Sequence, residues 1–180
     1  LMGRLSPPGR DAPAVCVLDS GAVQAHPLLA PALRTADQHA CQPIWGLDDS
    51  SGGWRGHGTG MACMALYGDL DAKLTGSKPI LLRHRLETVR ILPRRGHNPP
   101  ELYGAVTKTA VAMVERQAPH RPRVFCMAVT RSSMSRRWAA TRYTSIVHWN
   151  ELDRGGHFAA LEQPELFVAE LRACFAQMAL

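Results

Sequence analysis

The chain has 180 residues, which is long enough for one domain with its own hydrophobic core. Its formal net charge is +6, but no basic stripe with interleaved aromatic residues accompanies it, so we expect no nucleic-acid partner. The five cysteines form no CxxC pair, and no apolar run reaches the roughly 18 residues that a membrane span requires. We therefore expect a cytoplasmic protein without a disulfide framework, a zinc site or a membrane partner.

The first half of the chain predicts one buried strand and one helix. Residues 1–13 are rich in proline, glycine and arginine, and we expect them to form a loose N-terminal arm. The apolar run at 14–18 ends in Asp19, which is typical of a strand buried on both faces. Prolines and turn residues dominate positions 21–56 and predict a long loop, whereas residues 57–67 can form a helix.

The second half alternates between strand and helix patterns. "TVRILP" at 88–93 predicts a second strand, and apolar residues recur at helical spacing over 101–117. "RVFCMAVT" at 123–130 and "SIVHW" at 145–149 predict two more strands, and Pro164 is well placed to open a last helix. Strands that alternate with helices indicate an α/β domain with a mainly parallel sheet and flanking helices.

Asp19 and His57 are the residues whose positions suggest chemistry. In an open parallel sheet, functional groups gather at the carboxyl ends of the strands, where Asp19 is expected. A carboxylate there can accept a hydrogen bond from an imidazole and fix its tautomer. His57 stands between Gly56 and Gly58, which allow a close approach of backbone or substrate. Taken singly, such an aspartate is most often a turn residue and such a histidine a solvated cap.

Two motifs resemble those of subtilisin-like serine peptidases. "VLDSG" at 17–21 looks like the aspartate motif of that family, and "HGTGMA" at 57–62 looks like its histidine motif. "VFCMAV" at 124–129 is similar to the strand that lines the family's substrate cleft. The resemblance covers residues 14–138, which we expect to form a partial peptidase domain of the three-layer subtilisin-like fold.

This resemblance implies a serine-type endopeptidase that acts on peptide or protein substrates without a cofactor. It implies that Asp19 orients His57 and that His57 is the general base. It also implies that an extended peptide pairs with one strand through four residues, Cys126, Met127, Ala128 and Val129.

The sequence departs from the family pattern at several places. Gly60 stands where the family usually has a histidine or a glutamate, and the asparagine that donates to the oxyanion has no match. No Gly-Thr-Ser motif occurs, so no nucleophile is identified. Four serines lack the glycine-rich setting at a helix start that this role requires: Ser132, Ser133, Ser135 and Ser145. We therefore expect a truncated domain with little or no peptidase activity of its own.

The tail has a different resemblance. Residues 143–177, with "RGGHFAALEQPELF" at their centre, look like the C-terminus of epoxide hydrolases of the α/β-hydrolase fold. His157 matches the histidine that activates water in that family. We expect residues 139–180 to form a strand plus a helix. An epoxide-hydrolase fragment that uses His157 and a non-catalytic peptide-binding remnant are the alternatives to the peptidase.

Some questions stay open from the sequence. Because the chain starts at Leu1 rather than at a methionine, we expect it to be a fragment. A natural fusion or a frame error would also explain why its two parts resemble different enzyme families. The scattered histidines show no metal-ligand spacing, and we expect no metal site. Asp48 and Asp49 precede "SSGG" and predict a solvated turn rather than a calcium site. The oligomeric state is not predicted.

Overall fold

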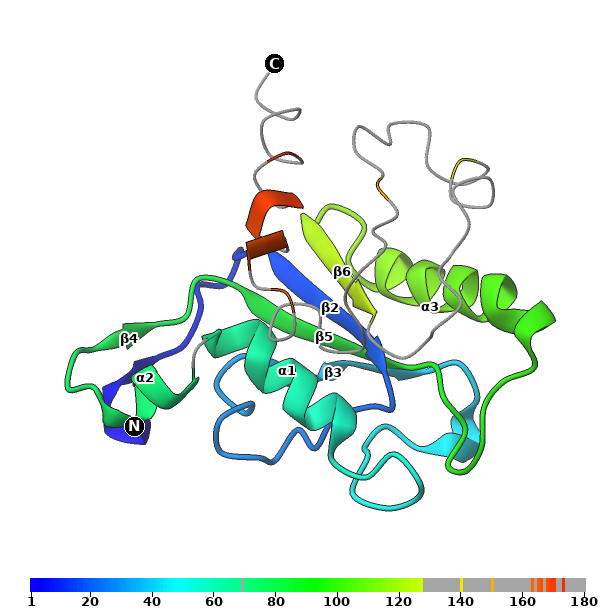
Figure 1. Ribbon diagram of the computed structural model, residues 1–180, viewed down its shortest axis with the longest axis horizontal. Coiled ribbons are helices and arrows are strands. Elements are labelled where there is room, and N and C mark those ends of the chain that lie inside the picture. The colour runs from blue at the N-terminus through cyan, green and yellow to red at the C-terminus, as the bar shows by residue number, and fades with distance from the viewer. Residues whose placement is uncertain are drawn as a thin grey trace. The chain divides into compact units, whose positions relative to one another are not determined.

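The computed structural model in Figure 1 describes residues 1–68 and 70–127, together with positions 140, 150, 163, 165, 166, 168, 169, 170 and 173. The chain divides into two compact units, Leu1–Met127 and Ala128–Leu180. All the helices and strands whose bounds are given below belong to the first unit. Within the described part of the chain, no helix is long and apolar enough to cross a membrane.

A four-stranded parallel sheet forms the centre of the first unit (Figure 1). Its strand order is β3 (Leu33–Ala40), β5 (Arg85–Arg90), β2 (Ala14–Asp19) and β6 (Arg123–Met127). Strand β2 pairs with β5 along its whole length and with β6 on its other side. Since β2 lies between two strands, its short apolar sequence is buried. Its last residue, Asp19, lies at the carboxyl-terminal edge of the sheet.

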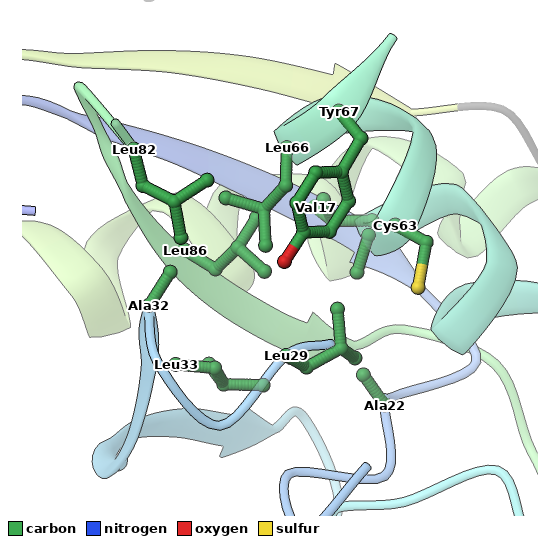
Figure 2. Packing of buried hydrophobic residues seen from close by; sticks show 11 residues of the cluster. Val17, Ala22, Leu29, Ala32, Leu33, Cys63, Leu66, Tyr67, Leu82 and Leu86 are labelled. Carbon is green, nitrogen blue, oxygen red and sulfur yellow. The ribbon is translucent and has the colours of Figure 1, made fainter. Parts of the chain in front are cut away.

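Helix α1 (His57–Tyr67) covers one face of this sheet. Val17 and Leu86, from adjacent strands, pack with Cys63 and Leu66 of the helix in one buried cluster (Figure 2). Tyr67 completes the cluster, and its hydroxyl donates a hydrogen bond to the Leu28 carbonyl at 2.7 Å. The apolar side of α1 therefore fixes the helix that begins with His57.

Helix α3 (Tyr103–Gln117) follows a 3-10 turn, η3 (Pro100–Leu102), and packs against β3 and β5. Its apolar stripe buries Ala110, Val111 and Val114. The parallel sheet with flanking helices confirms the predicted three-layer α/β class, and α1, α3 and β2 lie where the sequence patterns place them.

Charged side chains are buried beside α3. Glu87 of β5 is fully buried and pairs with Arg123 at 2.9 Å and with Arg121 at 2.8 Å. Arg121 also pairs with Asp37 of β3 at 2.8 Å, and Asp37 is buried as well. Two buried carboxylates and two partly buried guanidinium groups thus form one network that joins β3, β5 and the start of β6.

Strand β3 lies in the stretch that was predicted to be loop, so that prediction is wrong for Leu33–Ala40. The strand is at the edge of the sheet, and its pairing with β5 is irregular between Leu33 and Gln38. Its buried side chains include the polar pair Asp37 and Gln38, so no apolar alternation marks it. Both side chains have polar partners: Arg121 donates to Asp37 Oδ1, and Gln38 donates to the Ala22 carbonyl.

The N-terminal segment is attached to the domain, in contrast to the loose arm expected. After η1 (Met2–Arg4), strand β1 (Leu5–Ser6) pairs with β4 (Ile80–Leu81), and Arg4 donates hydrogen bonds to the carbonyls of Lys78 and Lys73. The short helix α2 (Leu70–Thr75) and the turn η2 (Pro43–Trp45) complete the first unit. The predicted strand at 145–149 lies outside the described residues.

Candidate active site

Asp19 and His57 meet at the carboxyl-terminal edge of the sheet. Asp19 Oδ1 lies 2.8 Å from His57 Nδ1. Asp19 is the last residue of β2, and His57 is the first residue of α1, so two rigid elements position the pair. The side chain of Asp19 is 1% exposed and that of His57 is 20% exposed, so the imidazole is accessible while its partner is not.

This contact determines which ring nitrogen carries the proton. A carboxylate accepts hydrogen bonds, so the geometry assigns the proton of a neutral His57 to Nδ1 and leaves Nε2 as the basic nitrogen. Asp19 Oδ1 also accepts the Ser20 backbone N–H at 2.6 Å and lies 3.0 Å from Ser20 Oγ. Asp19 Oδ2 is buried and has no hydrogen-bond partner among the described residues. The carboxylate is thus held by donors on one oxygen, the oxygen that faces His57.

Glycine is required beside this pair because two backbones come very close there. A Cβ at Gly58 would lie 2.1 Å from the Gly21 carbonyl oxygen, and one at Gly21 would lie 2.3 Å from the Leu47 carbonyl oxygen. Gly21 also has a φ of +88°, which residues other than glycine rarely adopt. The loop after Asp19 and the first turn of α1 can therefore touch directly, which brings the side chains of Asp19 and His57 together.

Trp54 forms a wall beside His57. The two rings meet edge to face, with their centroids 5.9 Å apart. Trp54 makes a similar contact with His97 at 5.0 Å, and its indole N–H donates to the Gly96 carbonyl at 3.1 Å. The indole of Trp54 therefore packs against one side of the imidazole.

Asp48 and Asp49 differ in environment, although both were expected in a solvated turn. Asp48 is exposed and accepts the Ser50 N–H at 2.9 Å; hydrogen bonds from Ser50 hold the pKa of Asp48 below its usual value. Asp49 is fully buried, so the prediction of a solvated turn is wrong for this residue. Its carboxylate accepts the Thr59 backbone N–H at 2.9 Å in the first turn of α1.

Sequence reasoning missed three polar residues that surround the pair: Ser20, Asp49 and Thr59. Ser20 and Thr59 lie inside the two motifs, so their places in the sequence were a usable signal. Asp49 lies eight residues before His57 in a glycine-rich loop, and nothing in that loop indicates burial.

The expected peptide-pairing residues are only partly described. Cys126 and Met127 belong to β6, which is an edge strand within the described part of the sheet, whereas Ala128 and Val129 lie outside the described residues. Burial raises the pKa of the Cys126 thiol, and the negative charge of Asp19 raises it further. Cys126 is therefore a neutral thiol at neutral pH and not a thiolate nucleophile.

The other candidate residues are not among those that the structure describes. Ser132, Ser133, Ser135, Ser145 and His157 all lie outside the described residues. In the part of the chain that the structure describes, no group of three or more histidine, cysteine or acidic residues could hold a metal ion. The described geometry is that of a buried carboxylate in contact with a partly exposed imidazole.

A family comparison agrees with this geometry. The family model of the subtilases, peptidase family S8, matches residues 10–168. The chain belongs to the subtilase family. The match starts before and ends after the 14–138 segment in which the resemblance was seen. Subtilases are serine-type peptidases, so the family implies a hydrolase with peptide or protein substrates.

A second comparison concerns a short segment of this subtilase. A protein of Stigmatella aurantiaca (strain DW4/3-1), provisionally named an epoxide hydrolase, is 60% identical over 43 residues. Those residues are 24% of this chain and 10% of that protein, so the chain spans about a tenth of that relative's length. The likeness agrees with the resemblance of the tail. No solved structure matches the chain.

Proposed function

We propose that this subtilase chain provides the aspartate and histidine of a serine endopeptidase site. In this proposal a serine hydroxyl attacks the carbonyl of a peptide bond, and His57 Nε2 takes its proton. Asp19 holds the ring through Nδ1 and stabilises the imidazolium that forms. The observation that supports the proposal is the contact of 2.8 Å between Asp19 Oδ1 and His57 Nδ1.

The environment of the pair favours this role. Asp19 is buried, so its charge acts on the imidazole with little screening by water. Its Oδ1 already accepts the Ser20 N–H, so the carboxylate is oriented before a proton arrives at His57. A base prepared in this way suits acyl transfer, in which positive charge appears on the imidazole only in the reacting state.

We further propose that an extended peptide binds by adding to strand β6 through residues 126–129. Strand β6 is an edge strand within the described part of the sheet, and it runs beside β2, which ends in Asp19. Cys126 lies opposite Val17, two residues before Asp19 on the neighbouring strand. A peptide paired there would lie on the open side of β6, one strand away from β2 and Asp19.

The 180 residues contain no Gly-Thr-Ser motif, and we expect the purified chain to show little or no peptidase activity. The test is the release of a fluorophore from a panel of peptide substrates, together with labelling by a fluorophosphonate probe. Measurable hydrolysis that is lost in His57→Ala would contradict the expected inactivity and would support the catalytic role of His57. His97→Ala is the matched control, because His97 contacts the same Trp54 without contacting Asp19.

The likeness to the protein provisionally named an epoxide hydrolase favours a second candidate function. In that proposal the chain retains the C-terminal part of an α/β-hydrolase, and His157 activates water. Turnover of a simple epoxide that is lost in His157→Ala and kept in His148→Ala would support it. A peptide-binding remnant without chemistry is the third candidate; it predicts peptide binding by fluorescence anisotropy and no hydrolysis of either substrate.

A further inference from the structure

The helix that carries His57 begins without a capping side chain of its own. Its N-cap residue is Gly56, at a φ of +76°, and no side-chain hydrogen bond caps the helix from that position. The first N–H groups of a helix have no partner inside the helix, so they need partners from elsewhere. Two side chains from outside the helix supply them, at the N–H groups of Gly58 and Thr59.

Ser20 is the partner of Gly58. Its hydroxyl oxygen accepts the Gly58 N–H at 3.0 Å and lies 3.0 Å from Asp19 Oδ1. A hydroxyl has one proton, and its shortest acceptor here is Asp19; Asp49 Oδ2 lies farther away, at 3.5 Å. Ser20 is fully buried, so this hydroxyl joins the first turn of α1 directly to the carboxylate that His57 contacts.

Asp49 is the partner of Thr59. Its Oδ2 accepts the Thr59 N–H at 2.9 Å, and its Oδ1 lies 2.5 Å from the Thr59 hydroxyl. That hydroxyl already accepts the Val23 N–H at 3.0 Å, so its own proton is donated to Asp49. Asp49 therefore orients the Thr59 hydroxyl, which joins the helix start to the loop after Asp19. The negative charge of Asp49 is also favourable at a helix N-terminus.

We propose that Asp49 and Ser20 are positioning residues for His57, which hold Nδ1 against Asp19 by fixing the first turn of α1. Ser20 contacts Gly58 and Asp19, and Asp49 contacts Thr59, so both act on the first turn of α1 and on the carboxylate beside His57. The first turn needs this support because Gly56 has no side chain with which to cap it. The turn also contains Gly58 and Gly60, and glycine is a poor helix former. The importance of this positioning for catalysis rests on the function proposed above, but the positioning itself does not.

The test is the Nδ1–H proton of His57, observed by NMR in the purified chain with ¹⁵N-labelled histidine and assigned with His57→Ala. In the unmodified chain, we expect a downfield signal that exchanges slowly with water. In Asp49→Asn, we expect loss of the signal or exchange at least about tenfold faster, because a buried charged acceptor is removed from the helix start. Asp48→Asn makes the same chemical change at the exposed neighbour and should leave the signal unchanged.

An unchanged His57 signal in a folded Asp49→Asn variant would overturn the proposal. If Asp49→Asn does not fold, Ser20→Ala and Thr59→Val decide in the same way, since each removes one hydroxyl of the network. A purely structural role would lower the midpoint of thermal unfolding but leave the exchange of this one proton unchanged. The readout does not depend on hydrolysis, so a failure of the proposed function would not be mistaken for a failure of this inference.

Discussion

Gly58→Ala is expected to lower the free energy of unfolding by about 3 kcal/mol and to separate His57 from Asp19. The added methyl group would lie 2.1 Å from the Gly21 carbonyl oxygen, which belongs to the backbone and cannot rotate away. It would also lie 3.0 Å from Ser20 Oγ and 3.2 Å from Asp19 Oδ1. Either the first turn of α1 or the loop after Asp19 must therefore move. Urea unfolding measures the loss of stability, and the NMR signal of the His57 Nδ1–H measures the separation.

Gly60→Ala is the matched control, two residues along the same helix. Among the described residues, a Cβ at Gly60 would meet no atom outside its own helix within 4 Å. Alanine is also favoured over glycine in helices by up to about 1 kcal/mol. We therefore expect Gly60→Ala to be neutral or slightly stabilising and to leave the His57 signal intact. Equal stability of the two alanine variants would show that the first turn of α1 does not lie against Gly21.

Glu87→Gln is expected to have the second large effect, a loss of about 3–5 kcal/mol in the free energy of unfolding. The substitution keeps the shape of the side chain but removes the charge that two arginines face, Arg121 at 2.8 Å and Arg123 at 2.9 Å. Breaking a buried ion pair from one side leaves the remaining charge buried and poorly compensated. Asp37 would then be the remaining carboxylate of the network, and it contacts Arg121.

Chemical denaturation of Glu87→Gln measures this effect, and Glu101→Gln provides the comparison at an exposed position. The Glu101 substitution is expected to change the free energy of unfolding by less than about 0.5 kcal/mol. A Glu87→Gln variant as stable as Glu101→Gln would show that the four charges are solvated and that β3, β5 and β6 are not joined by this network.

The pair at the centre of the site could be predicted because its signals are local. The run ending in Asp19 has the composition of a buried strand, and the segment after His57 has that of a helix. In a parallel sheet with flanking helices, these two ends lie at the same edge. The distance between them could not be predicted, because it depends on the contact between Gly58 and Gly21, which are far apart in the sequence.

Residues that act through long-range polar contacts could not be predicted. Asp49 can be buried because Thr59 donates a hydrogen bond to it, and Asp37 can be buried because it forms an ion pair with Arg121. Each of these acidic residues, read alone, is typical of a solvated turn or an exposed edge. Strand β3 could not be predicted for the same reason. Its side chains are buried because they have polar partners elsewhere in the chain, and no apolar alternation marks the strand.

The hydrogen bond from His57 to Asp19 is tested most directly by the tautomer of His57. The ¹⁵N chemical shifts of the two ring nitrogens in the histidine-labelled chain, recorded where His57 is neutral, distinguish a proton on Nδ1 from a proton on Nε2. With Asp19 Oδ1 at 2.8 Å from Nδ1, we predict the Nδ1–H form, and we predict its loss in Asp19→Ala. The Nε2–H form in the unmodified chain, unaffected by Asp19→Ala, would contradict the pairing and with it the assignment of His57 as a catalytic base.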